Sequence, residues 1–399
     1  MALRTAGGWR SAAGDASPSR MSSNTTIRPV VSKADREAFV DLVWDVYKDD
    51  PCWIPPLKDE VHGLLDPRKN PWFGHGRAAL WLAERGGKIV GRISAQVDDL
   101  VQEHMQPGTG QWGMIEALDG DAATALIATA EEWLRGQGMV RTLGPISISI
   151  WDEPGLLIEG FEEPPLVMMG HHRPEYRQWI EAAGYGKAKD LLTFELDIRI
   201  DMIPVIDRLI RAGEKNPRIR IRNVDKSRFD AEAAIILDIL NDAWSDNWGF
   251  VPLTDAEIAY AGKKLKPIIV EDLVKIAEVD GEPVAFMITI PDLNEMIRDL
   301  NGSLFPFGWA KLLWRLHKVT TRRVRVPLMG VRKAYQHGRM ASQLAFMLIE
   351  FTRRVCVDKY GIYIGEFGWV LEDNQGMMSI AQLPGAGINH TYRIYQKDL

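Results

Sequence analysis

The sequence has little cysteine, no excess of positive charge and no long apolar run. Its two cysteines, Cys52 and Cys356, stand far apart and match no spacing of metal ligands, which excludes a disulfide scaffold and indicates a reducing compartment. Lys and Arg number 48 against 54 Asp and Glu, and the net charge of −6 argues against a general binder of DNA or RNA. No stretch reaches about 18 uninterrupted apolar residues, so no helix is predicted to span a membrane.

The length and composition are those of a globular protein. With 399 residues, 46% of them hydrophobic, the chain has room for two or three domains with substantial cores. Residues 1–27 are rich in Ala, Gly and Ser, and they lack the apolar core that a signal peptide needs. We therefore expect a disordered leader over residues 1–27, followed by a cytoplasmic protein.

Two parts of the chain repeat the same order of predicted elements. Each part has a helix, a strand hairpin, a further strand followed by a helix, and a late strand. Ala83–Gly87 in the first hairpin also matches Ala277–Gly281 in the second. The pattern predicts an α/β fold with a mixed sheet and an internal duplication, divided into residues 28–200 and 201–399.

The most informative stretch is a strand, a tight polar turn and a helix. The strand alternates apolar residues with others, at Val324, Val326 and Leu328. The helix carries an apolar stripe at spacings of three and four residues: Met340, Leu344, Leu348, Phe351 and Val355. The turn between them, 335–341, leads into a helix N-terminus whose unpaired N–H groups suit a pyrophosphate. Plain α/β scaffolding is the alternative explanation of such a stretch.

This turn resembles the acyl-CoA loop of the GNAT acyltransferase superfamily, whose pattern is Gln or Arg, two residues, Gly, one residue, then Gly or Ala. Gln336 and Ala341 match the two ends, whereas Arg339 stands where the superfamily has Gly, with Gly338 one place earlier. Either the turn is shifted by one residue, or Arg339 adds a charge contact to a phosphate.

The resemblance implies that acyl-CoA is the co-substrate and that no metal takes part. It implies that the pantetheine arm lies in a gap beside a splayed strand, which suits Pro327 because proline has no N–H to pair. An edge strand is the alternative. The residues that the resemblance assigns to the co-substrate are Met329, Val331, Gln336, His337, Gly338, Arg339, Met340, Ala341, Ser342 and Asn374.

The corresponding turn of the first part is Ala117-Leu118-Asp119-Gly120-Asp121. Its two carboxylates would repel a pyrophosphate at the helix N-terminus. The first part is therefore predicted to be a degenerate copy, and the function is expected to reside in residues 201–399.

The superfamily reaction is attack of an amine on a thioester, which needs a base for the ammonium proton and a donor for the leaving thiolate. Glu366, expected at a strand end beside the gap, is the predicted base, since a carboxylate in an apolar strand is costly unless it is paired or functional. A solvated or salt-bridged Glu is the alternative. Tyr392 and Tyr395 are candidates to protonate the thiolate, and packing residues are the alternative for both.

The acceptor is expected to contact residues on the connections around this site. Asn247, Trp248 and Phe250 lie in a polar and aromatic loop that follows the first helix of the second part, and Trp369 follows Glu366. The remaining candidates lie just past the second hairpin: Asp292, Asn294 and Glu295. A packed helix connection and a simple turn are the alternatives.

Residues 304–323 look like an insertion into the GNAT pattern. They are rich in aromatic residues and carry basic ones, including Lys311, Arg315 and Arg322. That composition suits a helix on an anionic membrane surface, here the inner membrane, or a lid over a long acyl chain. A core helix is the alternative.

Three motifs and the tandem order resemble a group of bacterial GNAT-like proteins that includes ceramide synthases. The motifs are Asn247–Pro252, Pro291–Glu295 and Glu366–Asn374. The resemblance implies transfer of a long acyl chain from acyl-CoA to the amine of a sphingoid base such as 3-ketosphinganine. An N-acyltransferase for a small soluble amine or amino acid, and a non-catalytic binder of acyl-CoA or lipid, are the alternatives.

Overall fold

The computed structural model describes residues 25–378, 383 and 385–399. We call the described residues up to 200 the first half and those from 201 the second half. The strands of the first half are β1 (Thr26–Pro29), β2 (Gly76–Arg85), β3 (Lys88–Asp98), β4 (Thr109–Ala117), β5 (Arg141–Gly144), β6 (Ile146–Ser147), β7 (Glu153–Pro154), β8 (Leu156–Glu159) and β9 (Gly186–Asp197). Those of the second half are β10 (Ile219–Asn223), β11 (Val274–Val279), β12 (Glu282–Pro291), β13 (Arg323–Val331), β14 (Ile364–Leu371) and β15 (Gly387–Asp398).

The α-helices are distributed over both halves. The first half holds α1 (Lys33–Val46), α2 (Lys58–Leu64), α3 (Asp99–His104), α4 (Gly120–Gly136) and α5 (Glu175–Ala182). The second half holds α6 (Pro204–Glu214), α7 (Phe229–Trp244), α8 (Asp255–Leu265), α9 (Leu293–Ile297), α10 (Gly308–Lys318), α11 (Arg339–Arg354) and α12 (Gln375–Met378). Among the described residues, no helix is both long and apolar enough to cross a membrane.

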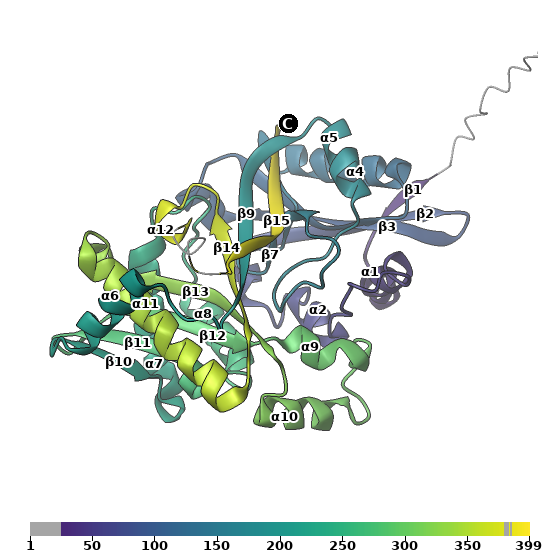
Figure 1. The fold of residues 1–399 in the computed structure, drawn as a ribbon. Coiled ribbons are helices and arrows are strands. Elements are labelled where there is room, and N and C mark those ends of the chain that lie inside the picture. The colour runs from purple at the N-terminus through teal and green to yellow at the C-terminus, as the bar shows by residue number, and fades with distance from the viewer. Residues whose placement is uncertain (1–24, 379–382, 384) are drawn as a thin grey trace, which may run out of the picture.

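One mixed sheet runs through both halves (Figure 1). Its order is β1-β2-β3-β4-β5-β15-β9-β14-β13-β12-β11-β10, with β8 also paired to β15. The last strand of each half is exchanged: β15 pairs with β5 of the first half, and β9 pairs with β14 of the second. The exchange joins the halves by backbone hydrogen bonds, so neither sheet is complete without a strand from the other half.

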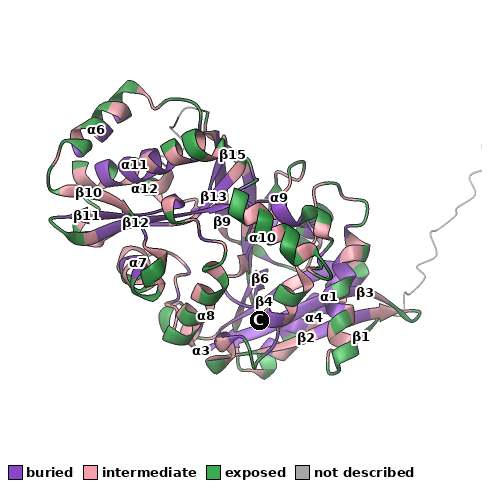
Figure 2. Ribbon diagram, turned by 90° about the horizontal axis from the view of Figure 1, so that it is seen from below, coloured by how far each residue is buried: buried purple, intermediate pink, exposed green. Residues whose placement is uncertain are grey.

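Helices cover both faces of each half of the sheet. In the second half, the core under α11 contains Leu348 and Met287, whereas the core under α7 contains Ile239 and Phe286. Met287 and Phe286 are neighbours on β12 and point to opposite faces, so α11 and α7 lie on opposite sides. In the first half, α4 and α1 hold the equivalent places. Figure 2 shows the buried strands between helices whose outer faces are exposed.

The structure confirms the predicted strand and helix around the 335–341 turn, as β13 and α11. It differs from prediction at three other places. The apolar run over 140–150 predicts a single strand, but it forms β5 and β6, which are separated by Pro145, a residue without an N–H for a ladder. α6 was not predicted; it starts with Pro204, the residue type favoured at the first helical position, and packs on α11. The third difference is that β14 continues beyond its expected end to Leu371.

Candidate active site

A gap opens between two parallel strands of the second half. β13 and β14 pair in parallel from Arg323 with Ile364 as far as Val326 with Phe367, and there the pairing stops. The next residue of β13 is Pro327, which has no N–H to continue the ladder. The splayed strand expected from the sequence is therefore present, at the predicted proline.

The turn that enters α11 leaves the helix N-terminus open. Gly338 precedes the helix with a φ of +87°, and no side chain of the described residues accepts a hydrogen bond from the N–H groups of the first turn. The glycine conformation thus falls one residue before the superfamily position, which favours the shifted turn. Arg339 begins the helix, is exposed, and makes no hydrogen bond or ion pair with another described residue. The four orphan N–H groups of this helix end can bind an anion.

Two adjoining pockets lie between this turn and the gap, and we call them together the channel. The two pockets share Trp244, Asn247, Trp248, Met329, Leu371, Asn374 and Met377. The end at the turn is lined by Gln336, Gly338, Ala341 and Ser342. The far end is apolar and is lined by Ile150, Trp151, Leu191 and Phe250. The channel therefore passes from an anion-binding helix end, through a strand gap, to an apolar end.

Side chains contact the backbone carbonyls of Met329 and Val331, two residues that the resemblance assigns to the co-substrate. The Trp244 indole N–H donates to the Met329 carbonyl oxygen at 3.0 Å. The Gln336 amide donates to the Val331 carbonyl oxygen at 2.8 Å. Both carbonyls thus point away from β12 and toward groups of the channel. A bound pantetheine amide would compete with these two donors.

The first half has closed its equivalent gap with its own side chains. β4 and β5 pair in parallel only over Thr109–Gln111, but beyond that point the Tyr176 hydroxyl accepts the Ala117 N–H at 3.0 Å. At the N-terminus of α4, the Asp119 carboxylate accepts the Ala122 N–H at 3.0 Å. A negative side chain thus occupies the place that an anion would need.

Glu366 is fully buried inside β14 and not at the strand end where it was expected. Its Oε2 accepts a hydrogen bond from the Asn389 amide at 2.8 Å, and His390 Nδ1 lies 3.9 Å from the same oxygen. Its Oε1 lies 3.6 Å from Arg325 Nε, and neither atom has a hydrogen-bond partner among the described residues. Glu366 does not line the channel, but Gly368, two residues later, does.

Arg325 is the counter-charge of Glu366 and is as deeply buried. Its guanidinium also donates to the carbonyls of Val167, in the first half, and Gly368. Burial lowers the pKa of Arg325, and the Glu366 carboxylate opposes that shift. The pair therefore sits at the junction of the two halves, within a hydrogen-bond network.

The two tyrosine candidates have separate surroundings. The Tyr392 hydroxyl donates to the Gly170 carbonyl at 3.0 Å, and burial raises the pKa of Tyr392 well above its usual value. Tyr395 lies in the core of the first half, with its hydroxyl 3.3 Å from a carboxylate oxygen of Glu181. The exchange of β15 carries Tyr395 there, away from the channel, so its position does not suit a donor to the thiolate.

The three candidates after β12 do not line the channel. Asp292 accepts hydrogen bonds from the N–H groups of Val167 and Asn294, and burial raises its pKa to about 6. Asn294 donates to the Pro165 carbonyl at 2.8 Å. Glu295 accepts the N–H of Arg322 at 3.1 Å. These side chains fix the turn and hold a loop of the first half, because their polar atoms are used by nearby backbone.

Of the other predicted contacts, some line the channel and others do not. The four residues Asn247, Trp248, Phe250 and Trp369 line the channel, as does Asn374. His337, Arg339 and Met340 belong to the turn but are not among the lining residues. Four further lining residues were not predicted from the sequence: Trp244, Ile150, Trp151 and Leu191. Trp244 was detectable from its place in the aromatic loop, whereas the other three come from the first half and gave no local signal.

Residues 304–323 form an exposed helix, α10, with its flanking loops. The large apolar side chains that are exposed here belong to Phe305, Phe307, Trp309, Leu313 and Trp314. Lys311 and Arg315 do not face solvent as free cations, because both pair with Asp299. The core-helix alternative is therefore wrong, since α10 has no buried residue. The basic residues contribute less free charge than the sequence suggested.

Comparisons with known proteins agree with this geometry. The chain is 43% identical over 376 residues to protein YghO of Escherichia coli (strain K12), covering 94% of this chain and 95% of that protein. It is 41% identical over 377 residues to the bacterial ceramide synthase of Caulobacter vibrioides (strain NA1000 / CB15N), covering 94% and 97%. No protein-family model matches the chain.

Two solved structures share the fold. A tandem GNAT protein from the clavulanic acid biosynthesis pathway superposes with a TM-score of 0.55 at 14% identity, covering 94% of this chain and 98% of that one. A GCN5-related N-acetyltransferase from Sphaerobacter thermophilus superposes with a TM-score of 0.50 at 13% identity, covering 94% and 95%. The fold is thus that of tandem GNAT proteins, and the chain belongs to the family of YghO and the bacterial ceramide synthase.

Proposed function

We propose that this protein is an N-acyltransferase that moves a long acyl chain from acyl-CoA to the amine of a sphingoid base, such as 3-ketosphinganine, in ceramide synthesis. The observation that carries the proposal is the channel from the α11 N-terminus to the apolar end at Trp151 and Leu191. Its three parts match the pyrophosphate, the pantetheine arm and the acyl chain in their order along acyl-CoA. The 41% identity to a ceramide synthase supports the choice of acceptor.

The co-substrate contacts follow from this placement. The α11 N–H groups and the exposed Arg339 guanidinium would hold the pyrophosphate. The backbone of Met329 and Val331 would pair with the pantetheine amides in place of Trp244 and Gln336. The first half, with Asp119 capping α4, would bind no co-substrate of its own.

The chemistry needs a proton to move in each direction. The ammonium of the acceptor gives one proton to the base, its nitrogen forms the C–N bond with the thioester carbon, and the C–S bond breaks. The nitrogen loses a second proton, and this balances the proton that the acid gives to the CoA thiolate. We assign the base to Glu366, whose carboxylate is kept beside Arg325 and has one oxygen that accepts no hydrogen bond from the part of the chain that the structure describes. Tyr392 is the remaining candidate for the acid, because Tyr395 lies in the core of the first half.

The test is product formation by purified protein. Palmitoyl-CoA with 3-ketosphinganine is expected to give an N-acyl product detectable by mass spectrometry, whereas acetyl-CoA with soluble amines gives none. Glu366→Gln is expected to lower kcat by at least about 100-fold, because it removes the general base. Glu195→Gln, which alters the carboxylate opposite Glu366 on β9, is the matched control and is expected to keep most activity. Acylation of soluble amines alone would contradict the acceptor, and acyl-CoA binding without turnover would contradict the reaction.

We also propose that the Phe305–Trp314 surface contacts the cytoplasmic face of the inner membrane. Its five exposed apolar side chains lie on one short segment, and Phe305 and Phe307 are 74% and 78% exposed. Aromatic side chains favour the interfacial region of a bilayer, and both proposed reactants are lipids. Since Lys311 and Arg315 are paired with Asp299, the attraction is expected to come mainly from apolar insertion.

Vesicle flotation tests this surface. The wild-type protein is expected to float with phosphatidylcholine vesicles, and addition of anionic lipid is expected to add little. Replacing Phe305, Phe307 and Trp314 by Ser should reduce the bound fraction at least about tenfold, because each loses apolar area from the bilayer. Val140→Ser, which removes an apolar residue of 64% exposure in the first half, is the control. Equal flotation of the triple variant and the wild type would overturn the proposal.

A further inference from the structure

The first half builds the apolar end of the channel. Ile150 and Trp151 lie between β6 and β7, and Leu191 lies on the exchanged strand β9, yet all three line the pocket in the gap of the second half. In the order proposed for acyl-CoA, this end receives the part of the acyl chain beyond the thioester. The first half, which has no open anion-binding helix end of its own, therefore contacts the end of the acyl chain.

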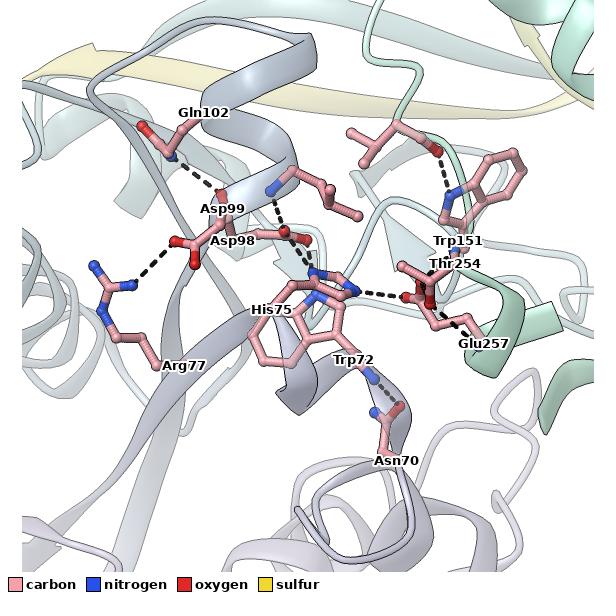
Figure 3. Close-up of polar contacts among 12 residues, drawn as sticks. Asn70, Trp72, His75, Arg77, Asp98, Asp99, Gln102, Trp151, Thr254 and Glu257 are labelled. Carbon is pink, nitrogen blue, oxygen red and sulfur yellow. Dashed lines mark hydrogen bonds and ion pairs between the residues drawn. The ribbon is translucent and has the colours of Figure 1, made fainter. Parts of the chain in front are cut away.

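Trp151 is held rigidly at this position. Its indole N–H donates to the Val251 carbonyl at 2.9 Å (Figure 3). Its ring stacks on Trp244 with centroids 6.1 Å apart and planes 13° apart, and it meets the edge of Phe250 at 5.9 Å. Trp244 is fixed in turn by its hydrogen bond to Met329. A side chain with this many directional contacts is a fixed wall, because moving it would break all of them together.

A second cavity lies directly behind the wall. It has room for about one water molecule and shares Ile150 and Trp151 with the channel. Its other lining residues include apolar Trp72, Leu100 and Val101 and polar His75, Asp98 and Glu257. The Gln111 amide also lines it, is 2% exposed, and has no hydrogen-bond partner among the described residues. An unpaired amide at this depth makes the cavity itself a poor place for a methylene chain.

Polar contacts between the halves hold the outer side of this cavity together. His75 of the first half has Nδ1 2.9 Å from Asp98 and Nε2 3.2 Å from Glu257 of α8 (Figure 3). The Trp72 indole donates to Asp98 at 2.8 Å, and Glu257 also accepts the N–H of Thr254, which caps α8. These contacts keep α8 and its loop against the first half, and Ile150 and Trp151 lie between the channel and the cavity.

We propose that Trp151 sets the maximum length of the acyl chain that the channel accepts. This inference rests on the proposed function, because it assumes that the channel holds acyl-CoA. Truncation of Trp151 removes the indole from the apolar end of the channel, and an acyl chain can then extend into the space that the indole filled. Trp151 is thus a specificity-determining residue supplied by the first half.

The experiment compares Trp151→Ala with the wild type over octanoyl-, dodecanoyl-, palmitoyl- and stearoyl-CoA, with 3-ketosphinganine as acceptor. The wild type is expected to show a sharp fall in kcat/KM beyond one length. In Trp151→Ala the ratio of kcat/KM for the first excluded length to that for the preferred length should rise at least about tenfold, because burial of each further methylene is favourable. Trp151→Phe, which keeps a ring but loses the N–H, should give a smaller rise.

A matched control removes another tryptophan of the first half. Trp133 packs against Trp81 with centroids 6.0 Å apart and does not line the channel. Trp133→Ala is expected to leave the length profile unchanged even if it lowers stability. A folded Trp151→Ala protein with the wild-type length profile would overturn the proposal.

Binding measurements separate this proposal from the proposed function. Thioether analogues of the four acyl-CoA molecules cannot transfer their chains, and their dissociation constants can be measured by calorimetry. Trp151→Ala should bind the longer analogues more tightly relative to the shorter ones than the wild type does. If the wild type binds these analogues but forms no product, the proposed reaction fails while the length comparison still decides the role of Trp151. Equal changes for all four lengths would overturn that role.

Discussion

Replacing Ser342 by Asp is expected to weaken CoA binding at least about tenfold relative to Ser342→Asn, because the new charge would lie beside the proposed pyrophosphate site in the first turn of α11. Ser342 is exposed and lines the channel end at the turn, so either side chain fits without disturbing the core. The two variants have nearly the same shape, and their difference isolates the charge. Isothermal titration calorimetry with CoA measures it.

The salt dependence of the same pair of variants provides the control. Screening reduces the repulsion between exposed charges, so the difference between Asp and Asn should shrink from 50 mM to about 500 mM salt. Ser227→Asp, on the surface next to α7 and outside the channel, should bind CoA as the wild type does. Equal affinities of the Asp and Asn variants at low salt would contradict a pyrophosphate at this helix end.

Replacing Glu366 by Ala is expected to lower the free energy of unfolding by about 3–5 kcal/mol, because it leaves the buried Arg325 without its counter-charge. The two side chains are 0% and 2% exposed, so water cannot replace the lost partner. Urea unfolding followed by fluorescence measures the change through the midpoint at unchanged slope. This loss is independent of catalysis.

Two further variants test whether the lost stability comes from the unpaired charge of Arg325. Replacing Arg325 and Glu366 together by Met should recover much of the lost stability, since a buried pair replaced by apolar side chains is often neutral. Glu60→Ala, which breaks an ion pair with Lys264 in which Glu60 is 58% exposed, should change the free energy of unfolding by less than about 1 kcal/mol. A Glu366→Ala protein as stable as the wild type would show that Arg325 needs no counter-charge.

The position of Glu366 within β14 decides which variant can test its role as the base. The sequence predicted Glu366 at a strand end beside the gap. In the structure it lies within β14 and is covered by Asn389 and His390. An amine in the channel meets Gly368 and Trp369 before it meets this carboxylate. For this reason the Gln variant, which preserves the shape, is the one that tests the base, and the Ala variant tests the fold.

The sequence by itself determined the features that depend on neighbours along the chain. The alternation in β13, the stripe on α11 and the turn with Gly338 were readable because strand and helix periods and a positive φ are local properties. Pro327 marked the end of the parallel pairing for the same reason. The repeated order of elements predicted the tandem fold. The composition of the aromatic loop predicted Asn247, Trp248 and Phe250, which line the channel.

Only the tertiary structure decided which distant residues meet. The exchange of β9 and β15 brings Leu191 to the channel and takes Tyr395 to the first half, and nothing in either strand's own pattern states which partner it will pair with. Asp292 and Asn294 look like acceptor contacts in sequence, but their polar atoms are used by the backbone of the first half. Trp151 likewise reaches the gap from another half of the molecule, because packing between halves is set by complementary surfaces and not by local periodicity.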